Sequence, residues 1–591
     1  MFQFVLRVPM GGHPTWLATA LILGTLAVAA PGSAQTVETP PAGPPPAPSA
    51  SGAVVATTTL DSLDYFSAAG RRTGLGNDLW KGASADLARS GLPALGSRPL
   101  EPGLSQLARQ LLATGARGPD GAHEDADLAG ERVLALIRLG DFEAARGVLA
   151  RTPGVAAHAR LSQAAAELAL WSGDLDRACT VGNALSEGRD GGFWLRLRAL
   201  CLASAGKTAE AQLALELAAA NPARDPALTR LVATMVNGGS PPPPSADTAL
   251  AYAASRALKL DLASVVATVP MPALLALASD EGQSPEVRRR AALRLIELGA
   301  DAAEVIRPVL LLATPPAPPA PAPEAVPLRK TRHGVHPRPT APAAEPGLSE
   351  AVRAEALARL YAAARNAVDP AERARALTTL LRPAQGLSFR ALSDLVAPDL
   401  ALVTPDGLSV EDRSLLALAA ATVNAASAQP LRDSLTRDGP GAASALTLSL
   451  IDAVRAVASP GRPVGEVLDR LVDAGSRATP ADSLKVQGAA VILFGVGDPA
   501  GADLSPLARL QLSRFEPGPA HHVGPALVAF AAVARGAAGE VALLTLSAAG
   551  TDGSTFSPAE RALFLRPLTR AGLAAEARSI AVDGLLALAG R

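Results

Sequence analysis

The chain has few aromatic residues, few histidines and very few cysteines. Phenylalanine, tryptophan and tyrosine make up 3% of its 591 residues, and there are seven histidines and two cysteines. Few aromatic side chains disfavour clefts that stack sugar rings. They also disfavour β-sheets, whose strands favour aromatic and β-branched residues in alternation. Alanine and leucine dominate instead, which predicts a nearly all-helical protein.

No charge of one sign dominates, and the common linear signatures of catalysis are missing. The 54 basic side chains balance 55 acidic ones, which gives no electrostatic reason to expect a nucleic acid or an anionic membrane as partner. The motifs G-x-S-x-G, H-E-x-x-H and C-x-x-C do not occur. Gly206-Lys207-Thr208 resembles the end of a phosphate-binding loop, but Cys201 stands where that motif needs glycine. We therefore expect no catalytic residue and no cofactor.

We also expect no metal site. Histidine and acidic side chains come together in three stretches: His123-Glu124-Asp125 with Asp127, His333 with His336, and His521-His522. In the first stretch the acids are typical of the first turn of a helix. In the second, binding would have to order a linker, and in the third, adjacent helical residues point in different directions.

The sequence has one long apolar run, and it lies near the start. This run, Trp16 to Ala30, follows Arg7 and precedes small residues, as in a secretory signal peptide. It is shorter than the roughly 20 residues of a membrane-spanning helix. We expect cleavage between Ala34 and Gln35, with an uncleaved anchor as the alternative. No cysteine follows the run to carry a lipid, so the sequence predicts a periplasmic or secreted protein without a further span.

Proline-rich stretches lie within residues 35–58 and 314–346 and divide the chain. A shorter break, formed by the four consecutive prolines that follow Gly238, closes the repeat region. The predicted segments are a signal peptide over 1–34, a disordered tether over 35–58, an N-terminal helical cap region over 59–123, helical repeats over 124–237, further helices over 246–313, a disordered linker over 314–346 and a C-terminal helical array over 347–591.

Four helix starts are marked by an oxygen side chain followed by proline. Ser284, Asp369, Thr479 and Ser557 each precede a proline, and this pattern predicts helices that begin near residues 285, 370, 480 and 558. The last of these helices contains Pro567, so we expect it to end or kink after about two turns.

Glycine and alanine recur with a fixed period of 33 residues. The glycines and the alanines five residues after them are Gly140 and Ala145, Gly173 and Ala178, and Gly206 and Ala211. Glycine ends a helix in the left-handed conformation, a nearby Asp or Thr begins the next one, and the small alanine lets both helices approach closely. Each unit is thus predicted to be one helix-turn-helix.

These units resemble the tetratricopeptide repeat family over residues 124–222. Gly140, Phe142 and Ala145 match the G-x-[YF]-x-x-A core of that family, and the second unit matches it more loosely. The third unit has Thr208 in place of the large residue, and the period is 33 instead of the usual 34. The resemblance implies an α-solenoid. With the capped helices it predicts an all-α array of hairpins in two halves joined by the proline-rich linker.

The cysteines and aromatics supply two further expectations. Cys179 and Cys201 fall on facing helices of neighbouring units, so we expect a disulfide, with two separate buried thiols as the alternative. Tyr65, Phe66 and Trp80 are expected to cap the exposed end of the array, with a protein-docking patch as the alternative.

These features lead to a functional expectation. An export signal, stacked hairpins and missing catalytic motifs favour a non-enzymatic scaffold that holds another envelope protein on the concave face of the array. The alternative is an envelope enzyme, for example one acting on cell-wall polymer, whose active site is not visible as a linear motif. The basic linker residues Arg329, Lys330, Arg332 and Arg338 are interpreted as solubilising charges, with an acidic partner as the alternative.

Overall fold

The computed structural model describes residues 64–220, 225–312, 349–382, 386–437, 443–459, 464–497, 523–550 and 556–591. The chain divides into two units, Met1–Asp61 and Ser62–Arg591, and the first lies wholly outside these ranges. The predicted signal peptide with its Ala34-Gln35 cleavage site, the tether, the 314–346 linker with its basic residues, and the histidines at 333, 336, 521 and 522 are also outside them.

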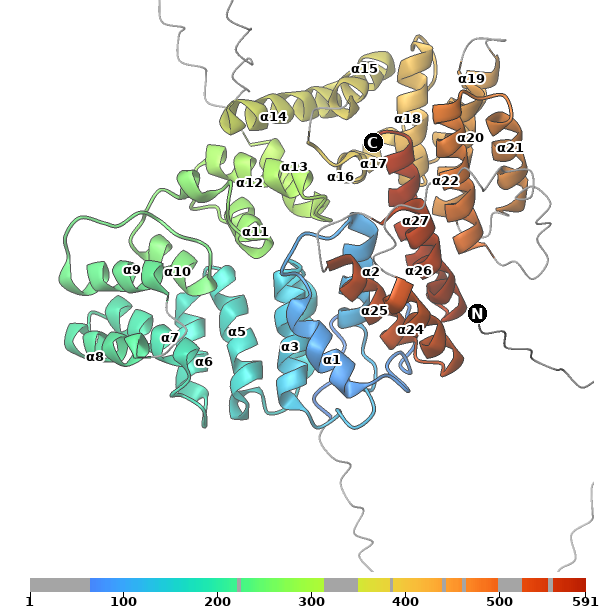
Figure 1. Cartoon of the computed structure of the whole chain (residues 1–591). Helices are drawn as coiled ribbons and strands as arrows, with labels where there is room; N and C mark the ends of the chain where they lie inside the picture. Colours follow the sequence, from blue (N-terminus) through green and yellow to red (C-terminus); the bar gives the residue numbers. More distant parts are fainter. Residues whose placement is uncertain are drawn as a thin grey trace, which may run out of the picture. The chain divides into compact units, whose positions relative to one another are not determined.

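The described part of the chain is all-α (Figure 1), and its one β feature is an isolated bridge between Ser84 and Asp120. Three short 3-10 helices, Leu92–Ala94, Val155–Ala157 and Leu262–Val265, lie between α-helices. The α-helices are α1 Ala85–Gly91, α2 Pro102–Ala113, α3 Ala126–Arg138, α4 Phe142–Arg151, α5 Ala159–Trp171, α6 Leu175–Ala184, α7 Gly192–Ser204, α8 Thr208–Ala219, α9 Pro226–Asn237, α10 Ala249–Ala257, α11 Met271–Ser279, α12 Pro285–Glu297, α13 Ala303–Leu310, α14 Glu350–Asn366, α15 Pro370–Leu381, α16 Phe389–Leu395, α17 Ala397–Leu400, α18 Val410–Thr422, α19 Ala428–Arg437, α20 Ala445–Ala458, α21 Gly465–Gly475, α22 Pro480–Val496, α24 Val523–Ala534, α25 Ala538–Gly550, α26 Pro558–Arg570 and α27 Ala574–Leu588.

Three helical hairpins repeat with the period of the glycines. The first helices α3, α5 and α7 begin at residues 126, 159 and 192, and the second helices α4, α6 and α8 begin at 142, 175 and 208. Each series advances by 33 residues, so the sequence spacing is also the spacing of the helices. The three alanines at 145, 178 and 211 are fully buried, as a close helix contact requires.

The turns follow one pattern, with one exception. Gly140, Gly173 and Gly206 have φ of 76°, 78° and 72°, a left-handed conformation that glycine adopts without a Cβ clash. Asp141 then caps α4, and its carboxylate accepts a hydrogen bond from the Ala144 amide. In the third turn the expected threonine cap is wrong. Thr208 is already the first residue of α8, and the N-cap residue is a lysine, which has no acceptor to offer.

The capping motifs locate the four predicted helix starts correctly, but Pro567 does not end its helix. α12, α15, α22 and α26 begin at prolines 285, 370, 480 and 558, each after its predicted cap. α26 continues to Arg570, because Phe564, Leu565 and Leu568 around the proline are buried in the core. Packing of that apolar face outweighs one missing backbone hydrogen bond.

The helices before and after residues 313–348 pack directly on each other. α14 lies against α12 and α13, and three ion pairs cross the contact: Arg289–Glu355 at 2.9 Å, Arg290–Glu350 at 2.8 Å and Arg353–Glu297. Further along the chain, α27 packs against α2, and α25 packs against α1 and α2. The last helices of the array therefore return to its first ones.

The N-terminal aromatics belong to that contact. Phe66 and Trp80 are fully buried and meet edge to face with ring centroids 5.7 Å apart. The indole of Trp80 lies so close to Gly539 of α25 that a Cβ there would stand 2.8 Å from it. The expectation that these rings cap an exposed end is therefore corrected for Trp80, because α25 from the other end of the sequence covers it, while Phe66 lies against Arg132 of α3 and Tyr65 against His158. No described helix is both long enough and apolar enough to span a bilayer.

Candidate groove of the repeat domain

A groove of about 630 Å³ crosses the N-terminal ends of the three first helices, α3, α5 and α7. We call it the repeat groove. Its walls include Asp127 of α3, Arg160 of α5 and Phe193 of α7. These residues are 33 positions apart, so they occupy the same position in three successive repeats. The repeat keeps the turn glycine and the buried alanine and varies side-chain chemistry at this groove-lining position.

Gly130 allows the first two walls to come together. A Cβ at this position of α3 would stand 2.7 Å from Cγ of Arg160 and 2.8 Å from its backbone carbonyl carbon. Any larger residue would push α5 away from α3 and widen the groove.

Most charged groups in the groove are already paired. Arg89 bonds Asp125 through two N–H groups, at 2.9 and 2.8 Å. Arg160 forms an ion pair with Glu131 and donates to Oε1 of Gln163 at 2.8 Å. Both guanidinium groups that line the groove are thus held by the protein's own acceptors.

One carboxylate of the groove keeps its acceptor capacity. Asp127 is exposed and forms no ion pair within the described part of the chain. Glu131, four residues further along α3, is engaged: its Oε1 atom pairs with Arg160, and its buried Oε2 atom lies 3.7 Å from the guanidinium of Arg138.

An aromatic pair forms the wall opposite these acids. Phe193 is half-buried, and Trp194 beside it is 7% exposed, with the two ring centroids 5.0 Å apart and nearly perpendicular. Gly191 and Gly192 precede them at the start of α7 and also line the groove, so no side chain screens the Phe193 ring there. The groove is thus acidic on one wall and aromatic on the other.

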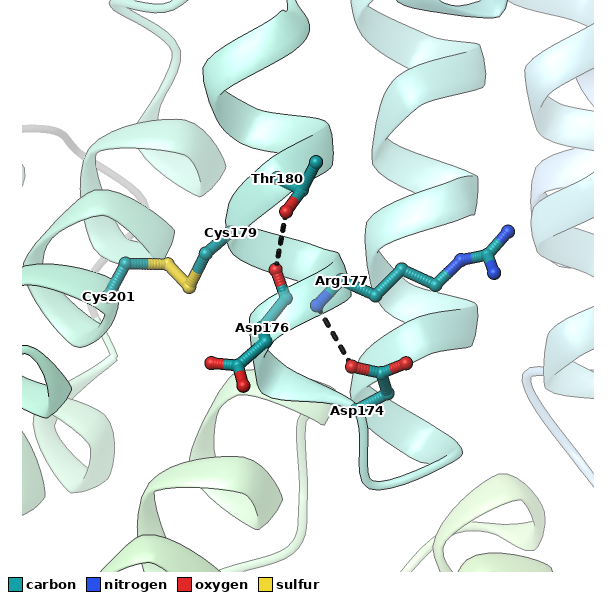
Figure 2. The surroundings of a disulfide bond; sticks show 6 residues. All are labelled: Asp174, Asp176, Arg177, Cys179, Thr180 and Cys201. Carbon is teal, nitrogen blue, oxygen red and sulfur yellow. Dashed lines mark hydrogen bonds between the residues drawn. A yellow bond between two sulfur atoms is a disulfide. The ribbon is translucent and has the colours of Figure 1, made fainter.

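A disulfide fixes the helix that carries the aromatic wall. Cys179 of α6 and Cys201 of α7 form a bond of 1.96 Å with Cα atoms 5.8 Å apart (Figure 2). The pair that the repeat register predicted is thus brought to disulfide distance. About one turn after Cys179, Gly182 of α6 lies close to Leu197 and Trp194 of α7.

The opposite ends of α3 and α5 are covered, whereas the turn glycine after α7, Gly206, has open space around it. Leu275 lies so close to the turn glycine Gly140 that a Cβ on this glycine would stand 2.2 Å from it. In the next turn, a Cβ on Gly173 would stand 2.4 Å from Arg256. Arg256 also pairs with Asp280 at 2.8 Å in a second pocket of about 800 Å³. α10 and α11 therefore pack on the turns that follow α3 and α5, and the repeat groove lies at the other ends of these helices.

The other residues singled out from the sequence lie at helix starts and turns. Asp125 is the N-cap of α3 and accepts from the Leu128 amide at 2.9 Å, and His123 lies 3.8 Å from Glu124. The described residues contain no group of three or more His, Cys, Asp or Glu side chains that could hold a metal ion. Gly206-Lys207-Thr208 is the turn between α7 and α8 and follows no strand.

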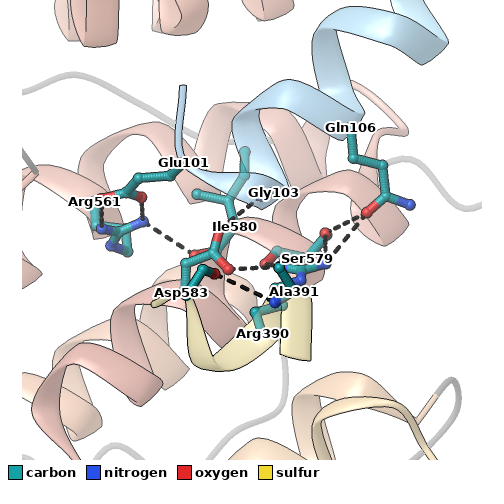
Figure 3. Close-up of polar contacts among 10 residues, drawn as sticks. Glu101, Gly103, Gln106, Arg390, Ala391, Arg561, Ser579, Ile580 and Asp583 are labelled. Carbon is teal, nitrogen blue, oxygen red and sulfur yellow. Dashed lines mark hydrogen bonds and ion pairs between the residues drawn. The ribbon is translucent and has the colours of Figure 1, made fainter. Parts of the chain in front are cut away.

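A buried ionic cluster joins α2, α16 and α27 (Figure 3). Arg390 donates to Asp583 at 2.7 Å and to the Ser579 hydroxyl at 2.7 Å, while the Gly103 amide donates to the other Asp583 oxygen at 2.6 Å. Beside it, Arg561 makes a bidentate bond to Glu101 at 2.7 and 3.0 Å. Burial raises the pKa of the Asp583 carboxyl. These groups bond one another and join the first helices to the last.

Sequence reasoning missed the groove residues, although a signal for them exists. The second residue of each first helix changes from Asp to Arg to Phe while the glycine of each following turn stays constant. That contrast becomes informative only after the helix starts are known to the residue. Comparisons of the chain with protein-family models, curated proteins and solved structures gave no match.

Proposed function

We propose that this protein is an exported, non-enzymatic scaffold that holds a segment of another cell-envelope protein in the repeat groove. One observation carries the proposal: three successive repeats place Asp127, Arg160 and Phe193 at one equivalent position in a shared groove. Repeat proteins use a constant framework to present variable side chains in this way. We infer that the hairpins are of the tetratricopeptide type.

The compartment is part of the proposal. The apolar run before Ala34 is typical of a signal peptide, and a Cys179–Cys201 bridge suits an oxidising compartment such as the periplasm or the extracellular space. Outside the cytoplasm, the bridge would hold α7 against α6 and keep the aromatic wall of the groove in place.

The arrangement of acids favours a scaffold over an enzyme. Glu131 is engaged by Arg160, and Glu167, whose pKa is raised by burial, accepts a hydrogen bond from Gln163 at 2.8 Å. Glu167 does not line the groove. A general acid must reach its substrate, and this carboxyl is behind the groove wall.

Site-specific crosslinking tests the proposal. The photoreactive residue p-benzoylphenylalanine would replace Phe193 in the groove, and in a matched control it would replace Thr180, which is exposed on α6. After irradiation of cells that produce the full chain, we expect a discrete adduct with an envelope protein from position 193 and none from position 180. Identical adduct patterns from the two positions, or no adduct from position 193, would contradict a groove-mediated scaffold.

A further inference from the structure

The charges of the repeat groove indicate which kind of segment fits it. Its lining contains three carboxylates, those of Asp125, Asp127 and Glu131, and two guanidinium groups, Arg89 and Arg160. Asp125 is fully used, because it bonds Arg89 twice and caps α3. Glu131 pairs with Arg160 and Arg138, and its Oε2 atom is buried. The remaining acceptor capacity is therefore on the exposed Asp127, and a ligand that satisfies this carboxylate must bring donors and positive charge.

The nearby charges reinforce this polarity. The side chain of Asp86, beside Arg89, is 93% exposed, and that of Glu124, just before α3, is 62% exposed. A cation that enters the groove would meet carboxylates on the α3 side, and the groove's own cations are occupied.

The opposite wall accepts the apolar part of such a side chain. Phe193 is half-buried and lines the groove together with Trp194 beside it and Leu128 of α3. Long cationic side chains bury their methylene stems against apolar surface, and a guanidinium also stacks on aromatic faces. The groove of about 630 Å³ has room for one such side chain together with a neighbouring apolar one.

We propose that the repeat groove binds a basic segment of a partner protein, in which an arginine or lysine adjoins a large apolar residue. The cationic group bonds Asp127, and the apolar neighbour packs on Phe193. This inference rests on the proposed scaffold function and specifies the partner's chemistry. The proposed occupant of the groove is a segment of another protein.

Three peptides that differ at one residue test the charge preference. The probes are fluorescent 12-residue peptides with a central Phe-Arg-Leu, Phe-Gln-Leu or Phe-Glu-Leu, titrated with the full chain and followed by fluorescence anisotropy. We expect affinity to fall in the order Arg, Gln, Glu, and the Arg peptide to weaken as salt is raised. Equal affinities, or a preference for the Glu peptide, would overturn the proposal.

Two matched variants locate the binding. Asp127→Asn removes an exposed carboxylate that makes no ion pair in the described chain, so the fold is kept. Glu210→Gln removes an exposed carboxylate on α8, away from the groove. For the Arg peptide we expect about a tenfold loss of affinity with Asp127→Asn, the usual effect of removing a charged hydrogen bond, and no loss with Glu210→Gln. Equal effects of the two variants would show that the peptide binds elsewhere and would overturn the proposal.

Two further outcomes separate this inference from the proposed function and from another occupant. If the photoreactive residue at position 193 crosslinks to an envelope protein but the Arg peptide does not compete with that adduct, the groove is a docking site. The basic-segment inference is then wrong, and the proposed scaffold function stands. If the Arg peptide binds only after deletion of residues 314–346, the occupant is the chain's own basic stretch, and the inference of a partner segment is wrong.

Discussion

Single glycines show how one atom can decide a helix contact. Gly140 and Gly206 occupy equivalent turns with nearly equal φ, but their surroundings differ. A Cβ on Gly140 would stand 2.2 Å from Cδ1 of Leu275 in α11, whereas a Cβ on Gly206 would meet nothing within 4 Å. The sequence period predicted the conformation of both turns. It could not predict that one of them also receives a later helix, because that contact joins residues far apart in the chain.

This difference predicts unequal effects of the same substitution. Gly206→Ala forces alanine into the left-handed conformation and should cost about 1 kcal/mol of stability. Gly140→Ala has the same backbone penalty and also displaces α11, so we expect a loss of about 2–4 kcal/mol. Urea unfolding followed by circular dichroism measures both values. Equal destabilisation by the two substitutions would show that the Leu275 contact is unimportant.

At the scale of helices, the disulfide determines how firmly α7 is held. The bridge joins α6 and α7 across the boundary between the second and third repeats, and α7 carries both aromatic residues of the repeat groove. Helix starts were predictable from the sequence because caps such as Ser284 and Ser557 act within one turn. The groove was not, because it needs the mutual placement of three helices.

Removal of the bridge should therefore loosen this part of the protein. Peptide mapping without reduction should find Cys179 linked to Cys201, and two free thiols would contradict the bridge. Replacing both cysteines with serine should lower stability by about 3 kcal/mol, as expected for a closed loop of this length. Hydrogen exchange should then rise in α7 more than in α3, which lies outside the loop.

At the scale of the whole described unit, the return of α27 to α2 brings distant ionisable groups together. Asp394 of α16 lies near this contact, where burial raises the pKa of its carboxyl to about 6 from an ordinary value of 3.8. Arg390 and Arg307 oppose that shift, and Asp301 and Asp583 add to it. Arg390 is a local neighbour, one turn earlier on α16, but Arg307, Asp301 and Asp583 come from other parts of the chain and are not predictable from the sequence around Asp394.

This environment predicts a pH-dependent stability. Between pH 3.8 and about 6, the folded chain keeps a proton on Asp394 that the unfolded chain has lost, so stability from this group falls as pH rises through that window. Asp394→Asn removes this dependence. The gain in stability of the variant over wild type should therefore be larger at pH 7 than at pH 4, by about 1–3 kcal/mol. Thermal unfolding at both pH values measures it, with the exposed Asp176→Asn as control. A pH profile parallel to that of wild type would contradict the prediction.

The contact between Gly103 and Asp583, which are 480 residues apart, limits how this chain could have grown during evolution. An open solenoid lengthens when a hairpin is duplicated, because each repeat touches only its neighbours. In this array an inserted hairpin would move α27 away from α2 and expose Trp80, Asp583 and Arg390 together. New copies of the hairpin are therefore disfavoured, and variation is directed to side chains that leave the spacing unchanged, such as those at positions 127, 160 and 193.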